Sequence, residues 1–217
     1  MGEVQVRVVN LDGRLQVSTR GGLVDVEAES HGYFSSAPQK IYERWAEFVT
    51  WYTGNRDRIS PAPGGGIDPG RIGAPTPSPR QVFAVGLNYA DHAAESGAER
   101  PESPVIFTKF ASAITGPVTT VPLPSDTVDW EVELVVVIGR GGRTSQMIFP
   151  VPALIEHLSH TLELYPGDVL FTGTPAGVGV GRTPQRFLGA GDVLRSRITE
   201  IGELVQTFTS SESVALV

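Results

Sequence analysis

The sequence predicts an α+β protein, mainly β, in which a small α+β domain precedes a larger strand-rich core. Short stretches of alternating apolar and polar residues recur along the chain, which is the pattern of half-buried strands. Two stretches, residues 38–54 and 150–164, space their apolar side chains as amphipathic helices do. A run crowded with proline and glycine, residues 61–79, lies between the two parts and predicts a linker.

Composition narrows the class of protein. The chain has 217 residues, of which 40% are hydrophobic, and this length allows a substantial core. Its net charge is −7 and it has no basic run, so we expect neither nucleic acid nor a membrane as a partner. It has no cysteine, which excludes disulfides, thiolate catalysis and zinc–thiolate sites. The first ten residues alternate like a strand rather than a signal peptide, so we expect a cytoplasmic protein.

Residues 1–60 predict the N-terminal α+β domain. Residues 4–17 alternate on both sides of Asp12-Gly13, a pair that favours a tight turn, and therefore predict a β-hairpin. Residues 23–26 predict a third strand, and the helix over 38–54 follows. The core, residues 80–217, predicts further strands at 81–86, 105–110, 128–138 and 201–208 and the helix at 150–164.

The stretch from 128 to 139 carries two carboxylates in a β-branched, apolar run that predicts a buried strand. Because side chains alternate along a strand, Glu131 and Glu133 share one face and lie about 7 Å apart. Two such carboxylates would repel each other and be costly to desolvate. A divalent cation held by oxygen ligands would remove both penalties, whereas an exposed strand end would leave each glutamate solvated. The residues alone leave both interpretations open.

Two further candidates carry ionisable side chains. His92 and Glu95 are three residues apart and can share one face of a helical turn. A histidine oriented by a carboxylate is a general-base unit, although a plain surface pair has the same spacing. Lys109 ends a predicted strand, where a lysine is usually a surface residue. His157 and His160 lack a third ligand nearby, and we interpret them as surface residues.

Four motifs in order resemble the fumarylacetoacetate hydrolase family, in particular its bacterial acylpyruvase and 2-hydroxyhepta-2,4-diene-1,7-dioate isomerase-like members. The motifs are GLNYADH at 86–92, WEVEL at 130–134, MIF at 147–149 and PGDVLFTGTPAGVG at 166–179. Each motif alone is weak, but their shared order and spacing are specific. The resemblance implies a mixed β-sandwich roll, a small variable N-terminal domain and a homodimer.

The resemblance also implies roles for single residues. Mg²⁺ or Mn²⁺ is held by three carboxylates in the family, and Glu131 and Glu133 match the first two. His92 and Glu95 match the family's His–Glu pair, which activates a water. The candidate substrate-binding residues are Thr174, Asn88, Tyr89 and Lys109.

The activity implied by the resemblance is metal-dependent C–C bond hydrolysis of a small β-diketo acid of the acylpyruvate type, such as fumarylpyruvate. A 2-oxo-carboxylate would chelate the cation, which would stabilise a metal-bound enolate as the bond breaks. His92 would deprotonate the attacking water. Decarboxylation of oxaloacetate and isomerisation of a 2-hydroxydienedioate would pass through the same enolate, and the sequence does not choose among them.

The chain departs from the family between its second and third motifs. Family members carry several dozen residues there, including the third metal carboxylate and a lysine, whereas here residues 140–144 bridge the gap. Asp126, Asp129 and Glu156 do not fit the missing motif. Either the polypeptide lacks the segment, or the sequence passes over residues that the protein contains. The second is favoured, because a deletion inside the core would leave unpaired strand edges. A true deletion would favour a non-catalytic binding or structural protein.

Overall fold

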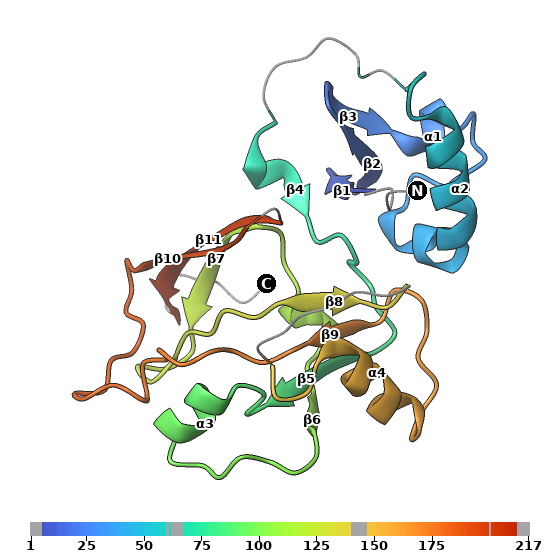
Figure 1. Ribbon diagram of the computed structural model, residues 1–217. Helices are drawn as coiled ribbons and strands as arrows, with labels where there is room; N and C mark the ends of the chain where they lie inside the picture. Colours follow the sequence, from blue (N-terminus) through green and yellow to red (C-terminus); the bar gives the residue numbers. More distant parts are fainter. Residues whose placement is uncertain (1–5, 60, 62–66, 140–146, 200, 212–217) are drawn as a thin grey trace.

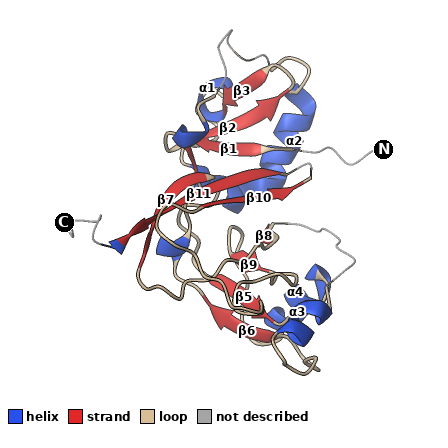
Figure 2. Cartoon of the chain, turned by 90° about the vertical axis from the view of Figure 1, so that its left-hand side faces the viewer, coloured by secondary structure: helices blue, strands red, loops and turns tan. Residues whose placement is uncertain are grey.

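The computed structural model describes residues 6–59, 61, 67–139, 147–199 and 201–211. Within these residues the strands form three sheets (Figures 1 and 2). The fold is α+β and rich in strands, which confirms the predicted fold class. No helix in the described part of the chain is long and apolar enough to span a bilayer.

The N-terminal sheet has the strand order β3-β2-β1-β4. Its strands are β1 (Val8–Leu11), β2 (Arg14–Thr19), β3 (Gly22–Asp25) and β4 (Ile72–Gly73). The predicted hairpin is present as β1 and β2, which pair antiparallel. Asp12 and Gly13 turn the chain with φ angles of 50° and 80°, a region that aspartate and glycine tolerate best.

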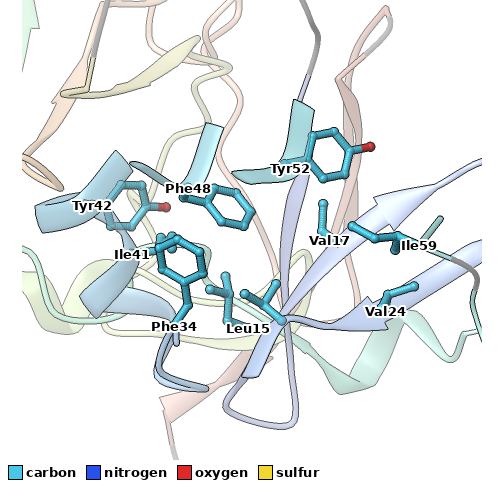
Figure 3. Close-up of a cluster of buried hydrophobic side chains, with 10 residues drawn as sticks. Leu15, Val17, Val24, Phe34, Ile41, Tyr42, Phe48, Tyr52 and Ile59 are labelled. Atoms are coloured by element: carbon cyan, nitrogen blue, oxygen red, sulfur yellow. The ribbon is translucent and has the colours of Figure 1, made fainter. Parts of the chain in front are cut away.

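Helical segments cover one face of this sheet (Figure 3). They are α1 (Val26–Glu29), the 3₁₀ helix η1 (Pro38–Arg44) and α2 (Trp45–Asn55). The predicted single helix over 38–54 is thus divided in two, because Arg44 leaves the helical region with φ −121° and ψ 24°. The two pieces bury aromatic side chains against the strands. The buried cluster contains Leu15, Val17, Val24, Val26, Phe34, Ile41, Tyr42, Phe48, Tyr52 and Ile59.

The second half of the proline- and glycine-rich segment, which the structure describes, forms hydrogen bonds with both parts of the chain. It forms the 3₁₀ turn η2 (Pro69–Arg71) and the short strand β4, and Asn10 Nδ2 donates to Ala74 O at 2.8 Å. The Thr76 hydroxyl lies 2.9 Å from Gly167 O and 3.0 Å from Gln39 Oε1, and donates to one of them at a time. Its proline content excludes a central strand, but β4 is an edge strand, which proline-rich surroundings permit.

The second sheet has the order β6-β5-β9-β8. Its strands are β5 (Val82–Gly86), β6 (Val105–Thr108), β8 (Val135–Val137) and β9 (Val169–Phe171). Strands β5 and β9 run parallel, and the other pairs are antiparallel. Helix α4 (Val151–Ser159) packs Leu154 and Leu158 against Phe83 and Leu170 on one face. Successive residues of β8 face different cores, since Val136 packs beside α4 and Val137 against the N-terminal cluster.

The third sheet has the order β10-β11-β7. Its strands are β7 (Val118–Leu123), β10 (Val193–Ile198) and β11 (Gly202–Ser210). Leu123, Phe208 and Leu188 form its small buried cluster, and Trp130 packs against them. The stretch before β8 therefore lies against the third sheet and leads from it into the second.

The prediction of one strand over 128–138 was wrong for residues 128–134, since only Val135–Val137 form a regular ladder. Side chains replace strand partners there. Thr172 donates its backbone N–H and its hydroxyl to Leu134 O, at 3.2 and 2.8 Å, and Val132 N donates to the Thr174 hydroxyl at 3.1 Å. The predicted gap at residues 140–144 lies outside the described residues.

Candidate active site at the edge of the second sheet

The predicted site residues come from segments that leave the second sheet. Because β5 and β9 are parallel, the residues that follow them lie at the same edge of the sheet. β5 leads to helix α3 (Ala90–Glu95), which carries His92 and Glu95, and β9 leads to Thr174. Lys109 follows β6, and Glu131 and Glu133 precede β8.

Glu133 is the most enclosed charged group of this site, with 8% of its side chain exposed. Lys109 Nζ lies 3.1 Å from Glu133 Oε1, and Gly173 N donates to Glu133 Oε2 at 2.6 Å. The ammonium of Lys109 also lies over the Phe171 ring, 4.3 Å from its centroid. Lys109 is therefore a partly buried lysine that pairs with the Glu133 carboxylate, and not a free surface lysine.

Glu131 is more exposed, yet its pKa lies above its ordinary value. The largest cause is the loss of water around its carboxylate, followed by repulsion from Glu133. The positive charge of Lys109 and the imidazole of His92 act in the opposite direction. One carboxylate thus interacts with groups from three other positions in the sequence, which places these groups in one electrostatic neighbourhood.

His92 and Glu95 form a close pair with 12% and 18% of their side chains exposed. His92 Nδ1 lies 3.5 Å from Glu95 Oε1, an ion-pair distance longer than a good hydrogen bond. Within the described residues neither atom has a hydrogen-bond partner, so the carboxylate is the natural acceptor for Nδ1–H. Glu95 Oε2 is fixed by Gly177 N, which donates to it at 2.8 Å.

Two of the expected substrate-binding residues, Asn88 and Thr174, are buried and hydrogen-bonded within the protein. Asn88 is fully buried, and its amide donates to Phe149 O and Thr172 O and accepts from Phe149 N. Asn88 thereby joins the chain before α4 to the end of β9, and its predicted substrate contact stays a prediction. Thr174 is 3% exposed, and its hydroxyl oxygen accepts from Val132 N.

Tyr89 is half-buried at the start of α3. Burial raises the pKa of its hydroxyl, and the negative charges of Glu133 and Asp91 raise it further. Tyr89 therefore shares the electrostatic neighbourhood of the two glutamates. Leu87, with a φ of 54°, makes the turn that separates β5 from this residue.

The sequence did not indicate a role for Asp129 in the site, but in the structure its carboxylate accepts three backbone N–H groups. Its carboxylate accepts from Gly179 N at 2.6 Å, from Val180 N at 2.7 Å and from Trp130 N at 2.7 Å. The one indication in the sequence was its position. Asp129 lies two residues before Glu131, so in an extended chain the two side chains point to the same face. Its partners Gly179 and Val180 lie 50 and 51 residues further on, and no local pattern reveals such contacts.

The residues present suit a divalent cation, although within the described part of the chain no group of three His, Cys, Asp or Glu side chains is placed to hold a metal. Mg²⁺ often takes only one or two carboxylates and keeps several waters. The raised pKa of Glu131 reflects first the loss of water around its carboxylate and then repulsion from Glu133, and a cation would relieve that repulsion. Because Glu133 already pairs with Lys109, we expect a cation to be held weakly.

This arrangement of sheets is the fold of the fumarylacetoacetate hydrolases, a class of strand-rich α+β enzymes. The family model for the fumarylacetoacetate (FAA) hydrolase C-terminal domain matches residues 81–146 and 140–209, more than half of the chain. The chain belongs to the fumarylacetoacetate hydrolase family.

Named relatives extend the comparison. The mitochondrial oxaloacetate tautomerase FAHD2A of Bos taurus is 32% identical over 211 residues, covering 61% of this chain and 67% of its own. Since those 211 positions take in only 61% of this chain, many are residues of the relative without a counterpart here. A crystal structure of a candidate HpcE protein from Mycobacterium smegmatis is 42% identical with a TM-score of 0.84, covering 94% of this chain and 99% of that one.

A third comparison shows the fold alone. Maleylpyruvate hydrolase from Sphingobium sp. SYK-6, solved with a manganese(II) ion and pyruvate, has a TM-score of 0.70 at 18% identity. The match covers 94% of this chain and 99% of that one.

Proposed function

We propose that the protein is a Mg²⁺- or Mn²⁺-dependent enzyme that transfers a proton between the keto and enol forms of a small 2-oxo dicarboxylic acid, with oxaloacetate as the first candidate. The observation that carries the proposal is the electrostatic neighbourhood of Glu131, where Glu133, Lys109 and His92 act on one carboxylate. The activity named for the bovine relative at 32% identity supports this choice of reaction.

Separate residues of the chain have separate roles in the proposed reaction. Lys109 supplies a fixed positive charge beside Glu133, suited to an enolate oxygen or a substrate carboxylate. His92, oriented through Nδ1 by Glu95, accepts the proton from the carbon next to the 2-oxo group at Nε2 and returns it to the enolate oxygen. A divalent cation held by Glu131 and Glu133 would supply Lewis acidity toward the 2-oxo group.

Hydrolysis of an acylpyruvate C–C bond is the second candidate. It is favoured by the enclosed His92–Glu95 pair, because such a pair can deprotonate a water that attacks the distal carbonyl. Decarboxylation and isomerisation of a 2-hydroxydienedioate remain alternatives at the same site. The homodimer and the cytoplasmic location remain predictions from the sequence.

The test is a set of parallel assays with Mn²⁺ on oxaloacetate, acetylpyruvate and fumarylpyruvate. Ultraviolet absorbance of the enol monitors each reaction. We expect enol–keto conversion of oxaloacetate to exceed turnover of the other two. His92→Asn should lower kcat by about 10²–10⁴-fold, the usual contribution of a general base, without changing Mn²⁺ affinity.

His160→Asn is the matched control, because His160 is exposed at the end of α4. It should leave all rates unchanged. Cleavage of fumarylpyruvate without enol–keto conversion of oxaloacetate would favour the hydrolase. A protein that binds Mn²⁺ but converts none of the three compounds would be a non-catalytic member of the family.

A further inference from the structure

Asp129 is the centre of a hydrogen-bond network that no pattern in the sequence predicted. Both of its carboxylate oxygens accept backbone N–H groups of the loop that follows β9, Gly179 at Oδ1 and Val180 at Oδ2. Trp130 N also donates to Oδ1, so both oxygens are occupied. Asp129 is thus bonded to the loop through both oxygens.

The loop that Asp129 holds is the loop that holds Glu95. Gly177 N donates to Glu95 Oε2 at 2.8 Å. Gly181 packs so closely on the Glu95 side chain that a Cβ at this position would collide with it. Arg182 fixes the same loop from outside, since it donates to Gly177 O at 3.1 Å and its guanidinium lies over the Trp130 ring.

We propose that Asp129 is a positioning residue, which sets Glu95, and through it His92, by fixing the loop of residues 177–181. The proposal rests on the proposed function for the role of His92. The chain of contacts runs from Asp129 to the Gly179 and Val180 amides, then from the Gly177 amide to Glu95, and then to His92. Because Asp129 lies two residues before Glu131, the segment that carries the cation ligands also fixes the base.

Asp129→Asn tests the proposal with little change in shape. An amide has one acceptor oxygen, so its NH₂ group would face a loop N–H and one bond would be replaced by repulsion. Hydrogen–deuterium exchange with mass spectrometry should show faster exchange in residues 175–182 and in residues 90–97. This measurement needs no substrate, so its outcome does not depend on the proposed function.

The kinetic part separates positioning from a general loss of structure. Asp129→Asn should lower kcat on oxaloacetate about tenfold, a part of the contribution of a general base, while KM changes little. Affinity for Mn²⁺ alone, measured by isothermal titration calorimetry, should also change little, because Glu131 and Glu133 are untouched.

Asp168→Asn is the matched control. Asp168 is also a buried carboxylate that accepts several N–H groups, from Gln81 and Tyr165, but it lies at the start of β9, away from α3. It should lower the melting temperature without faster exchange in residues 90–97. The proposal would be overturned if Asp129→Asn left exchange in residues 90–97 unchanged, or if Asp168→Asn raised it equally.

Arg182→Ala keeps the test open should Asp129→Asn fail to fold. Arg182 is exposed, so its removal does not disturb a core, yet it contacts the same loop. Faster exchange in both segments, smaller than in Asp129→Asn, is the expected result. Faster exchange in residues 177–181 alone would show that the loop does not position Glu95 and would overturn the proposal.

Discussion

Glu131 and Glu133 show how two equal side chains on one segment acquire different properties. Glu133 receives an ammonium and a backbone N–H, and these neutralise much of its charge. Glu131 receives no such donor among the bonds described for it, and its pKa rises. Glu133 is therefore the anchored carboxylate of the pair, and Glu131 is the one whose charge most needs a cation.

Removing the charge of either glutamate should weaken the binding of a divalent cation at the site. Glu133→Gln keeps an oxygen for the Gly173 amide but removes one negative ligand, so Mn²⁺ affinity should fall at least about tenfold. Glu131→Gln should act in the same direction. Isothermal titration calorimetry measures both, with Glu203→Gln, an exposed partner of Arg195, as the control. Unchanged affinity in both site variants would show that the carboxylates do not bind the cation.

The structure brings the predicted site residues close together, and their roles stay predictions. His92 with Glu95 and Glu131 with Glu133 are brought together by local spacing, which the chain itself displays. The environments of Asn88 and Lys109 depend on partners 24 to 84 residues away, and such contacts leave no local signal. A polar residue beside a motif is therefore as easily a buried support as a substrate contact.

At the scale of the elements, alternation and helical periodicity located most strands and both long helical regions, because these patterns reflect burial on one face. Two of the failed predictions share a physical cause. Residues 128–134 are held by the hydroxyls of Thr172 and Thr174 instead of a ladder, and the second half of the predicted linker pairs with β1. In both places the partner lies far away in the sequence.

The N-terminal unit predicts a pH-dependent stability through Asp25, which begins α1. Its hydrogen bond from Arg14 is the main cause that lowers its pKa below the usual 3.8. A lowered carboxylate pKa contributes stability above the unfolded value, and this is lost as the pH falls through the folded value. Asp25→Asn should therefore lower the melting temperature at pH 7 by about 1–3 °C.

The difference between Asp25→Asn and the native protein should shrink as the pH falls below about 3.8, where the native carboxyl group also becomes neutral. Thermal unfolding followed by circular dichroism at several pH values measures it. Asp57→Asn is the control, since 95% of the Asp57 side chain is exposed. An equal difference at pH 7 and pH 3 would contradict the role of the Asp25 charge.

At the scale of the whole molecule, the second sheet leaves apolar side chains exposed on the face away from α4. Val105 and Phe107 are 46% and 48% exposed, whereas Ile106 between them packs into the α4 cluster. Phe110, just beyond β6, is 82% exposed. Exposed apolar residues gathered at one edge are typical of a surface that another chain covers.

We therefore expect a homodimer in which this surface takes part. Light scattering coupled to size exclusion should give twice the mass of the chain, and Phe110→Asp should shift the protein toward the monomer without loss of fold. Ile201→Asp, at the 63%-exposed position in the turn between β10 and β11, is the matched control and should stay dimeric. A monomeric native protein would contradict the expectation.

Strand β8 gives neighbouring side chains to different cores, Val136 to the α4 cluster and Val137 to the N-terminal cluster. Ile138 N, one residue further, donates to Asp168 O, at the turn where Gly167 meets Thr76. Unfolding of either cluster would therefore remove packing contacts from β8, the strand that also packs against the other cluster. The compositional boundary at residues 61–79 divides the sequence into two parts, but because β8 packs against both clusters we expect the two parts to unfold together.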